Sequence, residues 1–174
     1  MYVLKPDEKT TPVMLYTHNT LVRGEAVSKQ SVLRVNIWLR TDGAPKYMHI
    51  LKPQVIVFGG TPVKPLSFSE IFFPTAQLIA FHTLPPTDEA LDYDPKESNR
   101  VMQDVKVLVG TFVIKGQVRI SAQTEFATSL EVARISWLSI YNVEIMNPYL
   151  PQMPPVQAPM MLVNPERVAF GVDA

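Results

Sequence analysis

The side chains that could carry chemistry are few and widely spaced along the chain. The histidines are His18, His49 and His82, and their spacing does not suggest a shared metal. We interpret each of them as a surface or strand-end residue and predict no metal and no cofactor. The chain has no cysteine, so it has neither a thiol nucleophile nor a disulfide.

Carboxylates concentrate between residues 84 and 101, where five of the 16 acidic residues lie. Catalysis by an acid and a base needs two groups in fixed geometry, which a polar linker does not provide. The serines lie outside any nucleophile-elbow pattern, and Gly59-Gly60 is not followed by the lysine, serine and helix of a phosphate loop. We therefore predict that the protein is not an enzyme, and an unrecognised enzyme is the last of three hypotheses.

Basic side chains concentrate in the first part of the chain. Residues 1–83 contain nine Lys or Arg against five Asp or Glu, residues 84–101 two against five, and residues 102–174 five against six. The total of 16 basic and 16 acidic residues argues against a generally polyanion-binding protein. Two readings stay open, phosphate contact or ordinary solvation of strand faces. The candidates for phosphate contact are Arg23, Arg34, Arg40, Lys46 and Lys52.

A proline-rich segment between residues 149 and 155 is the clearest candidate for contact with a partner. It could extend as an arm into an aromatic groove of a neighbouring subunit or a partner protein, or it could form a stiff loop. The candidate contact residues are Tyr149, Leu150, Pro151, Met153, Pro154 and Pro155.

Composition bounds the class of protein. A hydrophobic share of 47% over 174 residues can fill one core or two small ones. The apolar stretches are far shorter than a membrane span, and the first residues lack the basic and apolar pattern of a signal peptide. We expect a soluble, cytoplasmic protein with no membrane partner.

An internal repeat organises the chain. The spacing from Val13 to Gly24 equals that from Val105 to Gly116, and both stretches read as two short β-strands. Residues 50–55 then match residues 140–145, and the segment 71–81 matches the segment 161–170. Four blocks in the same order predict an internal duplication. The domains are expected at residues 1–83 and 102–174, with an acidic linker over 84–101.

Each half is predicted to be all-β with short helical segments. Gly24 and Gly116 lie inside the second strand of their halves, where a missing side chain marks a sharp bend or a close backbone approach. Pro53 lies inside a long strand and predicts an edge or a bulge there. Residues 31–40 and 124–132 fit neither strand nor helix periodicity cleanly, so they are either a short helix or an extended excursion.

Short strands, a bent second strand with a glycine, and two closing strands split by one turn resemble the Sm-like fold. The duplicated pattern is also similar to an uncharacterised bacterial family of Sm-like proteins. The resemblance implies two tandem Sm-like small β-barrels. It also implies rings in which the fourth strand of one barrel pairs with the fifth strand of the next, and hence a homo-oligomer.

The sequence departs from Sm-like RNA binders at the places where those proteins contact RNA. Residues 29–31 and 122–124 lack the acidic and asparagine motif, and residues 73–75 and 163–165 lack the basic pair of the final turn. The first hypothesis is therefore a non-enzymatic oligomeric binding or scaffold module, which forms a ring by strand pairing. The second is a ring that binds RNA or single-stranded nucleic acid through other residues.

Overall fold

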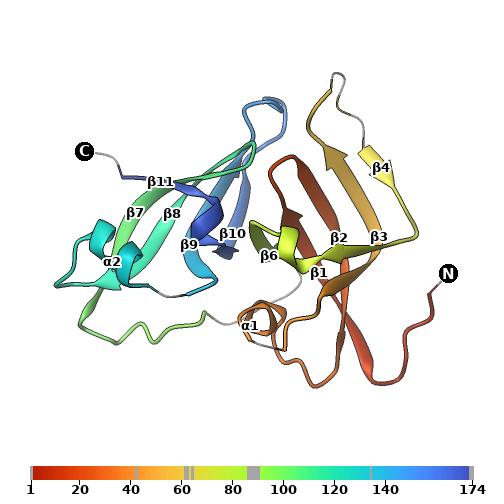
Figure 1. The fold of residues 1–174 in the computed structure, drawn as a ribbon, viewed down its shortest axis with the longest axis horizontal. Helices are drawn as coiled ribbons and strands as arrows, with labels where there is room; N and C mark the ends of the chain where they lie inside the picture. Colours follow the sequence, from red (N-terminus) through yellow and green to blue (C-terminus); the bar gives the residue numbers. More distant parts are fainter. Residues whose placement is uncertain are drawn as a thin grey trace. The chain divides into compact units, whose positions relative to one another are not determined.

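The computed structural model describes residues 2–41, 43–60, 63, 65–85, 91–133 and 135–172 (Figure 1). The chain divides into two compact units, Met1–Glu89 and Ala90–Ala174. The boundary falls inside the segment 84–101, in which residues 86–90 lie outside the described residues.

The first unit is one antiparallel sheet in the order β6-β1-β2-β3, with β4 and β5 both pairing β3. In Figure 1, β1, β2 and β3 run side by side and the helix α1 lies at one end of them. The elements are β1 (Glu8–Tyr16), β2 (Thr20–Lys29), α1 (Val35–Leu39), β3 (Tyr47–Val57), β4 (Pro65–Ser67), β5 (Glu70–Pro74), a 3₁₀ turn (Thr75–Gln77) and β6 (Ala80–Thr83).

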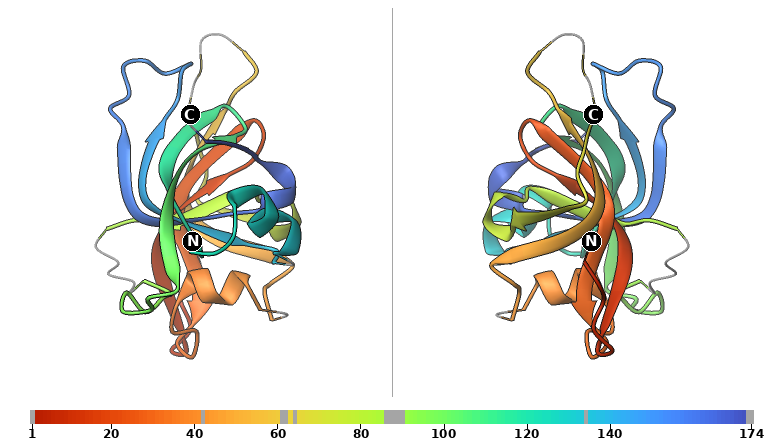
Figure 2. Two further views of the ribbon diagram at one scale, coloured as in Figure 1. Left: turned by 90° about the vertical axis from the view of Figure 1, so that its left-hand side faces the viewer. Right: turned by 90° about the vertical axis from the view of Figure 1, so that its right-hand side faces the viewer.

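The second unit is an antiparallel sheet in the order β11-β7-β8-β9-β10. Its strands β9 and β10 form a long hairpin whose loop lies at the tip, drawn in blue in Figure 2. The elements are β7 (Arg100–Val109), β8 (Phe112–Ser121), α2 (Phe126–Val132), β9 (Leu138–Met146), β10 (Val156–Val163), a 3₁₀ turn (Pro165–Arg167) and β11 (Ala169–Gly171).

The core of each unit comes from alternating strand residues, because successive side chains of a strand point to opposite faces. In β7, Val105 and Val107 are buried while Lys106 and Leu108 are exposed. Many of the buried side chains are β-branched, and such residues pack well on a pleated surface. The prediction of an all-β protein with short helical segments is confirmed.

The glycine of the second strand stands opposite a bulge in the third strand. Between the pairs Arg23↔Gln54 and Glu25↔Leu51, Gly24 alone faces Lys52 and Pro53. A β-carbon on Gly24 would collide with Ile50 Cγ2 and would lie 3.0 Å from the Leu51 carbonyl oxygen. The position therefore requires glycine, as expected from the sequence.

The second unit repeats this arrangement. Gly116 faces Asn142 and Val143 between the pairs Lys115↔Glu144 and Gln117↔Tyr141. A β-carbon there would lie 2.6 Å from Ile140 Cγ2 and 2.9 Å from the Tyr141 carbonyl oxygen. The first bulge residue is left-handed in both units, with φ 48° at Lys52 and 50° at Asn142.

Pro53 lies at this bulge, as its type predicts. Its carbonyl accepts a hydrogen bond from Phe68, which stands between β4 and β5. The bulge therefore coincides with a break in the neighbouring strand, since β4 pairs beyond Pro53 and β5 pairs before it. The corresponding strand β10 is continuous, so the described part of the first unit contains one more strand than the second.

The two ambiguous segments contain short helices. Over residues 31–40 the helix α1 spans five residues, and over 124–132 the helix α2 spans seven. Neither helix, nor any other among the described residues, is long and apolar enough to cross a membrane.

The described strand pairs leave both sheets open. They do not connect β6 to β5 in the first unit, nor β11 to β10 in the second. Taken by itself, the first unit therefore ends its sheet in β6 on one side and in β4 and β5 on the other, and the second unit ends in β11 and β10.

Candidate functional site: exposed edge strands and the bulge hollow

Among the edge strands, β5 is exposed. It pairs β3 from Glu70↔Leu51 to Pro74↔Tyr47 and leaves its other edge without a described partner. Phe72 on this strand is 59% exposed, and its ring stacks at 4.5 Å on the ring of His49. His49 Nε2 lies 2.7 Å from the carboxylate of Glu70. His49 contacts both the Phe72 ring and the Glu70 carboxylate, and these contacts hold the Phe72 side chain toward the surface.

The edge strand β11 is exposed as well. It is short and pairs only with β7, through Ala169↔Leu108, Phe170↔Val107 and Gly171↔Lys106. Leu108 is 53% exposed on the neighbouring strand and Val172, directly after β11, is 48% exposed. Phe170 packs edge-to-face on Phe126 of α2 with the ring centroids 5.6 Å apart. An apolar surface therefore accompanies this open edge.

The edge strands β6 and β10 differ from these. Residues 80–82 of β6 are all buried, and so are residues 160–163 of β10. In β5, by contrast, only Phe73 is buried, and in β11 no residue is. The edges that stay accessible to a partner are thus β5 and the short strand β4 in the first unit and β11 in the second.

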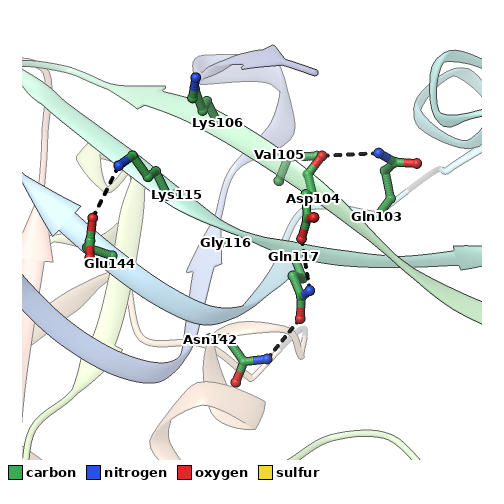
Figure 3. A pocket seen from close by; sticks show the side chains of 9 residues that line it. All are labelled: Gln103, Asp104, Val105, Lys106, Lys115, Gly116, Gln117, Asn142 and Glu144. Carbon is green, nitrogen blue, oxygen red and sulfur yellow. Dashed lines mark hydrogen bonds and ion pairs between the residues drawn. The ribbon is translucent and has the colours of Figure 1, made fainter. Parts of the chain in front are cut away.

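A polar hollow of about 650 Å³ lies at the bulge of the second unit (Figure 3). Gln117 is at its centre: its Nε2 donates to Asp104 Oδ1 at 2.8 Å, and its Oε1 accepts from Asn142 Nδ2 at 2.9 Å. Beside this row of hydrogen bonds, Lys115 Nζ lies 3.4 Å from Glu144 Oε1. Figure 3 shows these side chains reaching across β7, β8 and β9 toward one another. They connect the three strands where the bulge interrupts the ladder.

The bulge of the first unit has a simpler polar connection. Lys52 takes the place of Asn142, and its Nζ lies 3.1 Å from the carboxylate of Glu25. In both units the left-handed residue of the third strand therefore contacts the residue after the glycine of the second strand. This shared contact indicates that the polar side chains around the hollow stabilise the bulge.

The five basic candidates lie at three different places in the first unit. Arg23 and Lys52 stand at the bulge, and Lys52 is bound to Glu25. Arg34 and Arg40 flank the helix α1, and Lys46 directly precedes β3. Phosphate contact by these residues stays a prediction.

The proline-rich segment 149–155 forms the loop between β9 and β10. Two successive turns shape it, with Leu150 N–H donating to the Asn147 carbonyl at 3.0 Å and Met153 N–H to the Leu150 carbonyl at 2.9 Å. Tyr149 is 70% exposed, and Leu150 and Met153 are half-buried. The candidate contact residues are thus part of a hydrogen-bonded loop, and its binding of a partner stays a prediction.

In each unit, a segment with a tyrosine, which precedes the first strand, lies on the outer face of the third strand. We call these segments the polar straps, and sequence reasoning missed both. In the second unit, Asp92 accepts hydrogen bonds from Ser139 at 2.7 Å and from the Tyr141 hydroxyl at 2.6 Å, and Tyr93 packs edge-to-face on Tyr141. Residues 92–94 thus lie on the second unit, and β7 already begins at Arg100.

The first unit has an equivalent strap at its start. The Tyr2 ring packs edge-to-face on His49 at 4.5 Å, and its hydroxyl donates to Glu8 at 2.7 Å. The Lys5 backbone N–H and the Tyr2 hydroxyl both lower the pKa of Glu8. The signal for both straps was a tyrosine a few residues before the first strand of each unit.

A buried pair of ionisable side chains lies in the first unit. His82 Nδ1 is 2.9 Å from the Thr83 carbonyl, and His82 Nε2 is 3.0 Å from the Tyr16 hydroxyl. Since a carbonyl can only accept, Nδ1 carries the proton and Nε2 accepts from Tyr16. Burial lowers the pKa of His82 to about 4 and raises the pKa of Tyr16. The prediction of a surface role for His82 is wrong, since it is 2% exposed.

The fold and the site define only a class of protein, an antiparallel β protein of two units with the same strand order. Among the described residues, no three His, Asp or Glu side chains gather as metal ligands. The chain matches no family model, no curated protein and no solved structure.

Proposed function

We propose that the protein is a non-enzymatic scaffold or binding module that self-associates when β11 of one copy pairs with β5 of the next. Each unit is an Sm-like module, and the chain arose by internal duplication. One chain then supplies two adjacent positions of a larger assembly.

The register of the two sheets supports the duplication. In the first unit Gly24 is opposite Val13 and Ile71 is opposite Ile50; in the second, Gly116 is opposite Val105 and Met161 is opposite Ile140. The closing strands agree as well, since Phe81 faces Leu15 and Phe170 faces Val107. Unrelated sheets would share neither the bulge nor these pairs.

The observation that carries the proposal is the exposure of β5 and β11. An open strand edge presents unpaired N–H and C=O groups and favours pairing with another chain. Phe72 beside the first edge and Val172 beside the second would leave water on such pairing.

The two edges belong to different units, so their contact is heterologous, with different surfaces on the two copies. A heterologous contact closes into a ring when the rotation between neighbours permits closure and otherwise extends as a filament. The Sm-like resemblance favours the ring.

The test is the mass of the protein in solution. We expect light scattering to give a multiple of the 19.6 kDa chain mass for the wild type and a large loss of that mass for Phe72→Lys. The matched control is Leu33→Lys, at a residue that is 88% exposed and far from β5 in sequence. A monomeric wild type, or an unchanged assembly in Phe72→Lys, would contradict the proposal.

The other two hypotheses have less support. RNA binding rests on five basic residues at three separate places, and an enzyme would need a positioned acid, base or nucleophile. Binding to mixed RNA that weakens as the salt concentration rises would support the RNA-binding hypothesis instead. Wild-type protein that shows no such binding would exclude it.

A further inference from the structure

A cavity of about 360 Å³ lies in the second unit beneath the helix α2. Its walls are mostly apolar, with Val118 and Ile120 from β8, Leu138 from β9, and Phe126 and Leu130 from α2. Small-molecule sites in proteins are typically concave, largely apolar, and no smaller than about 300 Å³. The cavity meets these conditions without using any residue of the strand edges.

The helix between the second and third strands is packed more deeply in the first unit. Its helix α1 also connects the second strand to the third, and it buries Val35 and Leu39, which are 1% and 4% exposed. No residue of α2 is buried, and Val132 at its end is 68% exposed. Two aliphatic side chains thus anchor α1, which packs against β6, whereas α2 packs against β8 and buries no side chain.

The charged residues at the cavity are both arginines. The described lining contains Arg100 and Arg119 and no carboxylate. Arg119 is 14% exposed and its guanidinium lies 2.7 Å from Glu97, which holds it in place. Arg100 is 44% exposed and lies 3.6 Å from the same carboxylate, which is longer than a direct charge-assisted hydrogen bond, so its guanidinium can bind a second carboxylate.

We propose that this cavity binds a medium-chain aliphatic carboxylate. The aliphatic chain lies against Val118, Ile120 and Leu130, and its carboxylate binds Arg100. Removal of the chain from water stabilises the complex, and the charge-assisted hydrogen bond selects the acid. This inference is independent of the self-association proposed above.

The test uses the full chain and decanoate below its aggregation concentration. We expect calorimetry to give saturable binding of one decanoate per chain. In nuclear magnetic resonance spectra, decanoate should show contacts to the methyl groups of Ile120, Leu130 and Leu138. Non-saturable binding, or contacts confined to other residues, would overturn the proposal.

Different variants test the aliphatic part of the ligand and its carboxylate. Leu130→Trp fills the cavity and should weaken decanoate binding at least tenfold, whereas Leu33→Trp at an exposed position should leave it unchanged. Arg100→Gln should weaken decanoate severalfold and leave decanol binding as it was. Equal effects of Leu130→Trp and Leu33→Trp, or an Arg100→Gln variant with full decanoate affinity, would contradict the site. If Leu130→Trp does not fold, the wild-type methyl contacts decide the question alone.

Discussion

At the scale of the residue, Gly24 and Gly116 determine how each sheet is built. Both glycines let the third strand approach so closely that an isoleucine methyl and a backbone carbonyl occupy the place of a β-carbon. The backbone carbonyl cannot turn aside as a flexible side chain would. A larger residue must therefore move the third strand and its bulge.

This yields a prediction for Gly116→Ala. The new methyl group meets Ile140, which is fully buried, so we expect the free energy of unfolding to fall by about 1–3 kcal/mol, the usual cost of overpacking. Urea denaturation measures the change. Gly59→Ala is the control, because among the described residues no atom beyond its chain neighbours lies within 4 Å of a β-carbon at that residue. Equal stability of the two variants would show that the close approach does not restrain the sheet.

The buried His82 makes a second prediction at this scale. Its pKa in the folded chain is about 4, below the ordinary value of 6.5, because burial disfavours the imidazolium. Below pH 6.5 the unfolded chain binds a proton that the folded chain does not. The contribution of His82 to the free energy of unfolding is thus fully present above pH 6.5. It is lost as the pH drops toward 4, by about 3 kcal/mol in total.

The measurement for His82 compares two variants. Urea unfolding at pH 7 and pH 4.5 should show a smaller loss of stability in His82→Gln than in the wild type, because glutamine does not titrate in this range. His18→Gln, in an exposed turn, should retain the wild-type loss. The assignment is wrong if both variants behave alike.

At the scale of the element, the sequence predicts the strands but not the short helices and the polar straps that cover them. Alternation identified the long strands, and Pro53 identified the bulge, because each rests on a local backbone property. Residues 31–40 stayed ambiguous because a five-residue helix is too short to show a 3.6-residue period. The strap over β9 was missed because Asp92 and Tyr93 lie in an acidic stretch that reads as a linker. Their role depends on Ser139 and Tyr141, more than 40 residues away.

The strap of the second unit can be tested by Asp92→Ala. The substitution removes the acceptor of both the Ser139 and the Tyr141 hydroxyls, and hydrogen bonds to a charged group contribute about 1.5–3 kcal/mol each. We expect a loss of unfolding free energy of about 3 kcal/mol, measured by urea denaturation. Glu131→Ala, at an exposed position of α2, is the control and should cost far less. A cost equal to that of the control would mean that the strap does not stabilise the sheet.

At the scale of the whole molecule, the two units share their strand order and differ in what surrounds it. The total charge of zero combines a basic first part, an acidic segment and a nearly neutral second part. The sequence was sufficient to predict the close backbone approach at Gly24 and Gly116. It could not predict the exposed edges or the cavity under α2, because exposure depends on which strands find partners and on how deeply a short helix packs.

Complementation between two variants tests whether the assembly is heterologous. Phe72→Lys damages the β5 edge and keeps β11, whereas Val172→Lys damages the β11 edge and keeps β5. Each variant alone should be a monomer, since every contact needs one intact edge of each kind. Mixed together they should form a dimer of one chain of each, which native mass spectrometry resolves when one variant carries heavy isotopes. A β5-to-β5 contact would instead leave Val172→Lys associated by itself and would give no mixed dimer. That outcome would replace the ring with a symmetric pair built on the Phe72 surface.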